Sequence, residues 1–249
     1  MSKSALNPDF TIVTVIFNNA AMLRKTIQSV INQHNSSYEY IIIDGGSTDG
    51  SVDVIKENES HLTAWVSEKD TGIYNAMNKG IAMAKGKWIC FLNAGDVFAD
   101  DESLDKVSAF IDKNNSVDVF YGNILVDNSQ GGFNERIASE PCNKHRMFFC
   151  HQAAFVKTGL MKKYPFDEKY KMSADFKFFK KLFLNKFKFC HMNFPVAIYD
   201  TCGISNTVRK AGLLENIAVI KETDKGFEKI KFLARLYFVV FMLKVRKKK

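Results

Sequence analysis

The sequence has few cysteines, and none of them lies in a recognisable metal-binding or redox pattern. The five cysteines, at positions 90, 142, 150, 190 and 202, form no CxxC pair and no metal-ligand spacing. This disfavours cysteine zinc sites and dithiol redox sites. The first residues, Met-Ser-Lys-Ser-Ala-Leu-Asn-Pro, contain no apolar stretch of a signal peptide. Together with the odd cysteine count, this indicates a reducing cytoplasm.

Two common nucleotide-binding motifs are also absent. The first predicted strand is followed by Asn-Asn-Ala-Ala-Met with no GxGxxG, and GxxxxGK[ST] occurs nowhere in the chain. These motifs provide the glycines and the lysine that hold phosphates at a helix N-terminus. Their absence disfavours a Rossmann dehydrogenase and a P-loop NTPase.

The apolar part of the C-terminal tail is too short to span a bilayer. It covers residues 232–243 and is interrupted by Arg235. Twelve helical residues reach about 18 Å, whereas the hydrocarbon core is about 30 Å thick. An apolar helix flanked by lysines can instead lie in the membrane interface, so residues 229–249 are predicted to bind an anionic membrane surface. The alternative is a helix packed on the domain with a solvated basic end.

The chain has no excess of positive charge outside this tail. The chain carries 35 Lys and Arg against 27 Asp and Glu, a formal net charge of +8. Residues 225–249 contain nine of the basic residues and a single acid, Glu228, so they account for the whole +8 and residues 1–224 are formally neutral. A neutral body is not a polyanion-binding surface, so nucleic acid is not an expected partner.

The sequence does contain a regular alternation of strand and helix patterns in its first 92 residues. Runs rich in β-branched and aromatic residues predict strands, and apolar residues three or four apart predict helices between them. The ranges are 10–17, 38–43, 63–67 and 87–92 for the strands, and 20–33, 51–58 and 73–84 for the helices. This alternation predicts an α/β fold with right-handed crossovers and a mostly parallel sheet flanked by helices.

The second half of the chain is less regular. Strands are predicted at 117–126, 133–138, 151–156 and 187–191, with a turn at 128–132, and helices at 101–114, 173–184 and 207–222. Ser173 is placed as the N-cap of the second of these helices. Lys177, Lys180, Lys181, Lys186 and Lys188 indicate a solvated face, and the alternative is that they guide a lipid phosphate. No repeat or linker separates independent domains, and the length suits one domain with a C-terminal appendage.

Polar residues follow the ends of the first four strands. They are Asn18, Asn19, Asp44, Asp49, Glu68, Asp70, Asn93 and Asp96. Because the carboxyl ends of parallel strands share one edge of a sheet, these loops are expected to converge into a ligand site. Asp96 follows a buried run and a glycine, so it can face a bound ion or phosphate. The alternative is that it caps the helix beginning near residue 100 or 101.

The loop Asp44-Gly-Gly-Ser-Thr-Asp-Gly50 is the sharpest single signature in the chain. Its glycines allow the backbone to approach a ligand closely, and Asp44 can accept hydrogen bonds from a base or a ribose.

Taken together, six segments resemble the family 2 glycosyltransferases, especially those that build bacterial exopolysaccharide, capsule and O-antigen. They are TVIFNN (14–19), IIIDGGSTDGS (42–51), SEKDTGIYNAMNKGI (67–81), FLNAGD (91–96), HQAAF (151–155) and FDEKYKMSADFKFF (166–179). The resemblance covers about residues 10–180 in collinear order. It implies a GT-A fold and the inverting transfer of a sugar from a nucleotide-diphosphate donor.

The resemblance also implies roles for individual residues. The donor would be bound by Thr14, Val15, Asn18, Asp44, Gly45, Asp70, Asn75, Asn78 and Asn93. Asp96 would be the metal ligand for Mg²⁺ or Mn²⁺, while His151 and Gln152 would face the acceptor. Asp175 would be the catalytic base.

Two departures from the family pattern bear on the donor and the metal. Asp44-Gly45 stands where the family commonly has Asp-Asp, so one base-contacting carboxylate is missing; a UDP-sugar is the favoured donor. Asn93 and Gly95 stand where the acids of the DxD-type motif often sit, which leaves Asp96 as its only acid. The donor phosphates are therefore expected to hold much of the metal, as is common for Mg²⁺.

Asp175 has a structural explanation as well. It lies in the first turn of the predicted helix, where the helix dipole stabilises an acid by about 0.3–1 kcal/mol. The same position favours an ionised carboxylate at neutral pH, which a base requires.

The sequence thus predicts an inverting glycosyltransferase that extends a polyprenyl-linked or oligosaccharide acceptor in surface polysaccharide synthesis, at the inner face of the cytoplasmic membrane. Residues 1–97 would form the nucleotide-sugar-binding half, 98–206 the acceptor-binding half, and 207–249 C-terminal helices with an amphipathic, basic tail. One alternative is a sugar nucleotidyltransferase, which would need a glycine-rich loop with Lys or Arg after the first strand. The other is a non-catalytic sugar- or nucleotide-binding module.

Overall fold

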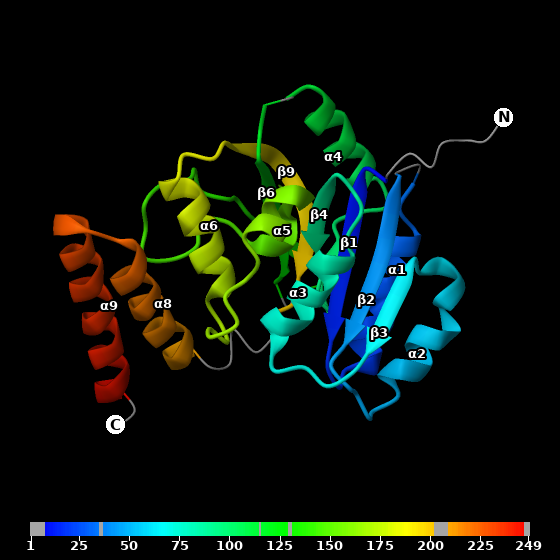
Figure 1. Ribbon diagram of the computed structural model, residues 1–249, viewed down its shortest axis with the longest axis horizontal. Coiled ribbons are helices and arrows are strands. Elements are labelled where there is room, and N and C mark those ends of the chain that lie inside the picture. The colour runs from blue at the N-terminus through cyan, green and yellow to red at the C-terminus, as the bar shows by residue number, and fades with distance from the viewer. Residues whose placement is uncertain (1–7, 35–36, 115, 129–130, 202–208, 247–249) are drawn as a thin grey trace.

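The computed structural model describes residues 8–34, 37–114, 116–128, 131–201 and 209–246. Cys202, the middle of the predicted turn at 128–132, the start of the predicted helix at 207 and the last three lysines lie outside the described residues. One mixed sheet runs through the molecule, with helices on both faces, and the helices α8 and α9 lie side by side at the end far from α2 (Figure 1).

The first half of the sheet is parallel, as predicted. It consists of β1 (Phe10–Ile16), β2 (Tyr38–Asp44), β3 (Ala64–Ser67) and β4 (Trp88–Phe91), in the order β3-β2-β1-β4. Each neighbouring pair is parallel, so all four strands end at the same edge. This is the edge at which the polar loops were expected to meet.

Both faces of β1, β2 and β4 are buried, as expected for continuous apolar runs, whereas the edge strand β3 is only half-buried. Val13, Val15, Ile41 and Ile43 belong to one apolar cluster, which includes residues of α3 (Ile73–Met83), α5 (Thr158–Lys163) and α6 (Ala174–Leu184). The alternate residues Phe10, Ile12, Tyr40 and Ile42 belong to a second cluster, which includes residues of α1 (Ala20–Ile31), α2 (Ser51–Glu57) and α4 (Ser103–Asp112). The period-two alternation thus builds a three-layer α/β domain.

The second half of the sheet is mixed. It continues from β4 through β8 (Ala154–Lys157), β6 (Val119–Asp127), β9 (Phe189–Tyr199) and β5 (Val97–Phe98), with β7 (Phe133–Arg136) paired to β6. β8 is antiparallel to both of its neighbours, while β9 is parallel to β6. The α/β class and the GT-A-type architecture are confirmed, with the parallel strands confined mainly to the half that ends at the polar loops.

Several elements differ from the sequence prediction. Residues 151–153 form a short 3₁₀ helix, η2 (His151–Ala153), so the strand predicted at 151–156 begins only at Ala154. The strand predicted at 187–191 runs on to Tyr199, and α5 and the two-residue β5 were not predicted. A second 3₁₀ turn, η1 (Glu59–His61), follows α2.

The prediction of a solvated lysine face on α6 is wrong for its two central lysines. Lys177 is 4% exposed and Lys180 is 2% exposed, and both lie against α8 (Arg209–Thr223) and the turn that follows it. Their ammonium groups are paired with Glu222 and Asp224 respectively. Helical periodicity alone did not reveal these acids, because they come from a later element.

The C-terminal helix α9 (Gly226–Arg246) packs on α8 through one face and exposes apolar side chains on the opposite face. Phe232, Leu236 and Val240 are buried against Ile217 and Ile220 of α8. The opposite face exposes large apolar side chains, namely Phe227, Ile230, Phe238 and Phe241, each at least 60% accessible. Within the described residues, no helix has the length and hydropathy needed to cross a membrane.

Candidate active site

The loops at the carboxyl edge of the parallel strands are tied to one another, as predicted. The backbone N–H of Gly45 donates to Ile16 at the end of β1, at 2.9 Å, and that of Ala94 donates to Val15, at 3.2 Å. The loops after β1, β2 and β4 therefore form one continuous rim.

Asp44 organises its own loop. Its carboxylate is fully buried and accepts hydrogen bonds from the N–H groups of Gly46 and Ser47, at 3.1 and 3.0 Å. The hydroxyl of Ser67, at the end of β3, donates to the same carboxylate at 2.6 Å. The side chain thus fixes the shape of the loop, and its contact with a nucleotide stays a prediction.

Gly45 marks a close approach between two loops. A Cβ atom at this position would lie 3.2 Å from Oδ2 of Asp70 and 3.3 Å from a ring carbon of Phe17. Asp70 is itself paired with Lys79 at 2.5 Å. A larger side chain at position 45 would therefore displace Asp70 or Phe17, which gives a steric reason for the glycine.

Three other predicted donor-binding residues lie on β1 or just after it. The Thr14 hydroxyl is buried and donates to the carbonyl of Leu92 at 2.7 Å. Val15 belongs to the core, whereas Asn18 is exposed and accepts from the N–H of Thr48 at 2.8 Å. Of these three, Asn18 is therefore the side chain placed openly on the rim.

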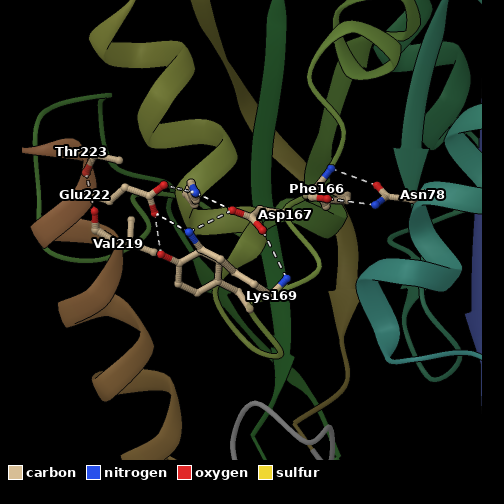
Figure 2. A network of polar contacts seen from close by, with 9 residues as sticks. Asn78, Phe166, Asp167, Lys169, Val219, Glu222 and Thr223 are labelled. Atoms are coloured by element: carbon tan, nitrogen blue, oxygen red, sulfur yellow. Dashed lines mark hydrogen bonds and ion pairs between the residues drawn. The ribbon is translucent and has the colours of Figure 1, made fainter.

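Asn75 and Asn78, on α3, hold a segment of the second half of the chain. The amide of Asn78 donates to the carbonyl of Phe166 at 2.9 Å and accepts from its N–H at 2.9 Å (Figure 2). Both asparagines also donate to Glu168, at 3.0 and 2.8 Å. They join the two halves of the domain, and a direct donor contact by either one stays a prediction.

Asp96 is a buried carboxylate that does not cap a helix. Its Oδ1 accepts from the N–H of Asp200 at 2.9 Å and its Oδ2 accepts from the amide of Gln152 at 3.0 Å. Helix α4 begins at Ser103, and its N-cap residue is Glu102. The helix-cap alternative is therefore wrong. Burial raises the pKa of Asp96 to about 6, although these two hydrogen bonds oppose the rise.

The oxygen atoms around Asp96 fit a hard divalent cation. The Oδ1 atom of Asn93 is buried and has no hydrogen-bond partner. A carboxylate oxygen of Asp200 lies 2.7 Å from where a Cβ of Gly95 would be. The part of the chain that the structure describes contains no cluster of three or more His, Cys, Asp or Glu residues suited to a metal. These residues fit a cation that takes one or two carboxylates and further oxygens from phosphates, as Mg²⁺ does.

Asp175 lies in the first turn of α6 and has a donor at each carboxylate oxygen. The hydroxyl of Tyr74, on α3, donates to Oδ1 at 2.8 Å, and Nδ1 of His151 lies 3.1 Å from Oδ2. Burial alone would raise the pKa of Asp175, but the hydrogen bond and the charge of His151, together with the Tyr74 hydrogen bond, lower it. The carboxylate is therefore ionised at neutral pH, as a base must be.

The short helix η2 connects the two carboxylates. Its first residue, His151, contacts Asp175, and its second, Gln152, donates to Asp96. The Nε2 atom of His151 also lies 3.5 Å from the amide nitrogen of Asn93. Five predicted site residues are thus brought together here: Asn93, Asp96, His151, Gln152 and Asp175.

Two residues of this cluster were not predicted. Tyr74 lies inside a segment that supported the family resemblance, yet a tyrosine on a helix with apolar spacing looks like an ordinary core residue. Asp200 directly follows β9, whose length was underestimated. A strand followed by an acid was the available signal for Asp200.

The comparisons with known proteins agree with this geometry. A family model described as Glycosyl transferase family 2 matches residues 11–172. A PGL/p-HBAD biosynthesis glycosyltransferase of Mycobacterium tuberculosis is 31% identical over 215 residues, which cover 81% of this chain and 80% of the relative.

Solved structures share the fold. The chain matches Staphylococcus aureus TarS 1-349 in complex with UDP with a TM-score of 0.69 and 20% identity, covering 92% of this chain and 70% of that one. It matches the mannosyltransferase PcManGT of Pyrobaculum calidifontis, in complex with GDP-Man and Mn²⁺, with a TM-score of 0.66 and 16% identity, covering 95% and 70%. At these identities the likeness supports the architecture alone.

Proposed function

Since the chain belongs to glycosyltransferase family 2 and is a glycosyltransferase, we propose that it transfers a sugar with inversion from a nucleotide-diphosphate donor to a lipid-linked or glycan acceptor. One observation carries the proposal. The short helix η2 contacts two carboxylates, Asp96, whose pKa is raised, and Asp175, whose pKa is lowered. Both lie at the edge of the sheet where the loops after the parallel strands converge. Such a pair divides metal binding and proton abstraction between two residues.

The proposed reaction is a single displacement. The acceptor oxygen attacks the anomeric carbon as the bond from that carbon to the diphosphate breaks, so the configuration inverts. The hydroxyl proton passes to Asp175, which Tyr74 and His151 hold in place. Asp96 and Oδ1 of Asn93 would hold Mg²⁺ or Mn²⁺, which would neutralise the departing diphosphate. His151 and Gln152 contact Asp175 and Asp96, and in this proposal they face the acceptor.

In this proposal residues 1–97 bind the nucleotide sugar, residues 98–206 bind the acceptor and residues 207–249 form the membrane-associating part. The matched mycobacterial relative is a PGL/p-HBAD biosynthesis glycosyltransferase. We propose that the acceptor of this chain is lipid-linked and is used at the inner face of the cytoplasmic membrane. A sugar nucleotidyltransferase is disfavoured by the family match. A non-catalytic binding module would bind donor and acceptor saturably without any turnover.

We expect UDP to bind at least about tenfold more tightly than GDP, which corresponds to about 1.4 kcal/mol. The carboxylate that could accept hydrogen bonds from the N1–H and amino group of guanine is Asp44, and it already accepts three from its own loop and from Ser67. Calorimetry with each nucleoside diphosphate and Mn²⁺ tests this, and a preference for GDP would refute the UDP assignment.

The apolar face of α9 is expected to bind anionic membranes. The double variant Phe238→Ser, Phe241→Ser should lower binding to phosphatidylserine-containing vesicles by at least about tenfold, because burying each Phe contributes about 1.5–3 kcal/mol. These residues are 64% and 60% exposed, so their loss leaves the contact with α8 intact. Deleting the tail would be a poorer test, because it also removes Phe232, which packs on α8.

The matched control for this experiment is Phe133→Ser, Ile137→Ser. These residues are 53% and 68% exposed and lie on or beside β7, far from α9 in the sequence. The control should bind vesicles like the parent. Equal loss in both variants would indicate nonspecific hydrophobic adsorption, and no vesicle binding by the parent would leave α9 as a packed helix only.

A further inference from the structure

Helix α8 supplies a carboxylate to the start of the helix that carries Asp175. Oε1 of Glu215 accepts from the N–H of Lys171 at 2.9 Å, and its Oε2 accepts from Met172 and Ser173 at 2.8 and 3.0 Å. Ser173 holds the predicted N-cap position, but its side chain makes no cap hydrogen bond. Backbone donors that enter a helix need such partners, and here a single residue from a distant helix provides them.

A second acid of α8, Glu222, contacts side chains on either side of residues 171–173 but none of their N–H groups. Glu222 accepts from the Tyr170 hydroxyl at 2.8 Å and from the Lys177 ammonium at 2.7 Å, and Lys177 also pairs with Asp167 at 2.6 Å. Figure 2 shows Asp167 and Glu222 pointing toward one another from their two elements. Burial alone would raise the pKa of Glu222, but the hydrogen bonds from Lys177, Tyr170 and Lys169 lower it to about 2. Glu215 and Glu222 are seven residues apart, so they share one face of α8.

The segment that precedes α6 is held on its other side by α3 and by the loop that precedes α3. Lys171 donates through its ammonium to the carbonyl of Thr71 at 2.8 Å, and Asn75 donates to Glu168 at 3.0 Å. Asp175 follows this segment by two residues, and its carboxylate must meet both Tyr74 and His151. The position of the carboxylate therefore depends on where residues 171–173 are anchored.

We propose that Glu215 is a positioning residue for Asp175, which couples the C-terminal helical pair to the active site. The proposal rests on Asp175 being the base of the proposed reaction. Its physical reason is that a shift of about 1 Å in a reacting group can cost about 10²-fold in rate. Glu215 lies beyond residue 172, where the match to the family model ends.

The test compares Glu215→Ala with the matched control Glu222→Gln. Release of UDP or GDP would be followed with UDP-glucose, UDP-N-acetylglucosamine and GDP-mannose in the presence of Mn²⁺. Glu215→Ala should lower kcat by about 10–100-fold, the effect of a misplaced reacting group. KM for the donor should stay within about threefold. A raised KM reports the loss of binding that is equal in the ground and transition states, and a misplaced base does not remove such binding. Glu222→Gln should lower the melting temperature and keep kcat, since it contacts no N–H at the start of α6.

Two further variants separate positioning from general stability. Glu215→Gln should recover part of kcat, because its amide oxygen can still accept from the N–H groups of Met172 and Ser173, although its NH2 group cannot accept from Lys171. In an Asp175→Asn background, Glu215→Ala should cause little additional loss, because residues acting as a unit are strongly non-additive. Full additivity, or equal kcat losses for Glu215→Ala and Glu222→Gln, would overturn the proposal.

The outcome for the base itself is separate. If Asp175→Asn is nearly normal, the proposed reaction fails; if it is inactive while Glu215→Ala is normal, only the positioning role fails. A spectroscopic measurement needs no turnover: the NMR signal of the His151 imidazole, which contacts Asp175, should change in Glu215→Ala and remain in Glu222→Gln. An unchanged His151 signal in Glu215→Ala would contradict the proposal even if none of the three donors is hydrolysed.

Discussion

The Asp175→Asn variant should fold and bind donor nucleotide normally but lose sugar transfer by about 10²–10⁴-fold, which is the usual cost of losing a positioned base. The substitution keeps the size of the side chain and removes its ability to take a proton. Asp175 is suited to this role because its pKa is lowered and because Tyr74 and His151 fix both of its oxygens. The measurements are single-turnover transfer, donor calorimetry and thermal melting on the same preparations.

Tyr74→Phe is the matched control for Asp175→Asn. It removes one hydrogen bond to the same carboxylate, at 2.8 Å in the parent, and leaves the base in place. Its rate should fall by less than that of Asp175→Asn. A purely structural Asp175 would behave differently: transfer would stay near normal, and only the about 0.3–1 kcal/mol of helix-dipole stabilisation would be lost.

The second large effect is expected at Asp96. Asp96→Ala should abolish the Mn²⁺-dependent part of UDP binding, because Asp96 is the acid of the loop after β4 and shares a turn with Asn93, whose buried Oδ1 has no hydrogen-bond partner. The parent should bind UDP much more tightly with Mn²⁺ than with EDTA. The variant should show the same weak binding in both conditions, measured by calorimetry.

Two companion variants make the Asp96 test specific. Asp96→Asn retains the shape of the side chain, which matters because Gln152 and the N–H of Asp200 would otherwise lose their acceptor at a cost of about 1–3 kcal/mol each. Asp100→Ala removes a nearby acid that binds Lys106 and the N–H of Glu102, and it should keep metal-dependent binding. Metal-dependent UDP binding at the level of the parent in both Asp96 variants would show that Asp96 is not a ligand.

Much of the first half of the fold was determined by local sequence. The β-branched runs of β1 and β2 and the helical spacing of α1 and α3 are short-range patterns, so they identify elements without knowledge of the partners. Their alternation requires parallel strands, and parallel strands bring their carboxyl ends to one edge. The convergence of the loops that contain Asp44 and Asp96 followed from this geometry. The family resemblance added roles for residues that no local pattern could distinguish from turn residues.

Only the tertiary structure decided how the site is assembled. Tyr74 and Asp175 are 101 residues apart, and Gln152 and Asp96 are 56 apart, yet each pair is within hydrogen-bond distance. The burial of Lys177 likewise could not be predicted from local sequence, because its partner Glu222 comes from a later helix. Periodicity shows which face of an element is apolar, but it cannot show which polar group from elsewhere in the chain will meet that face. Pairings across the fold depend on how whole helices pack, and this packing places Glu215 at the start of α6 and Asp175 between Tyr74 and His151.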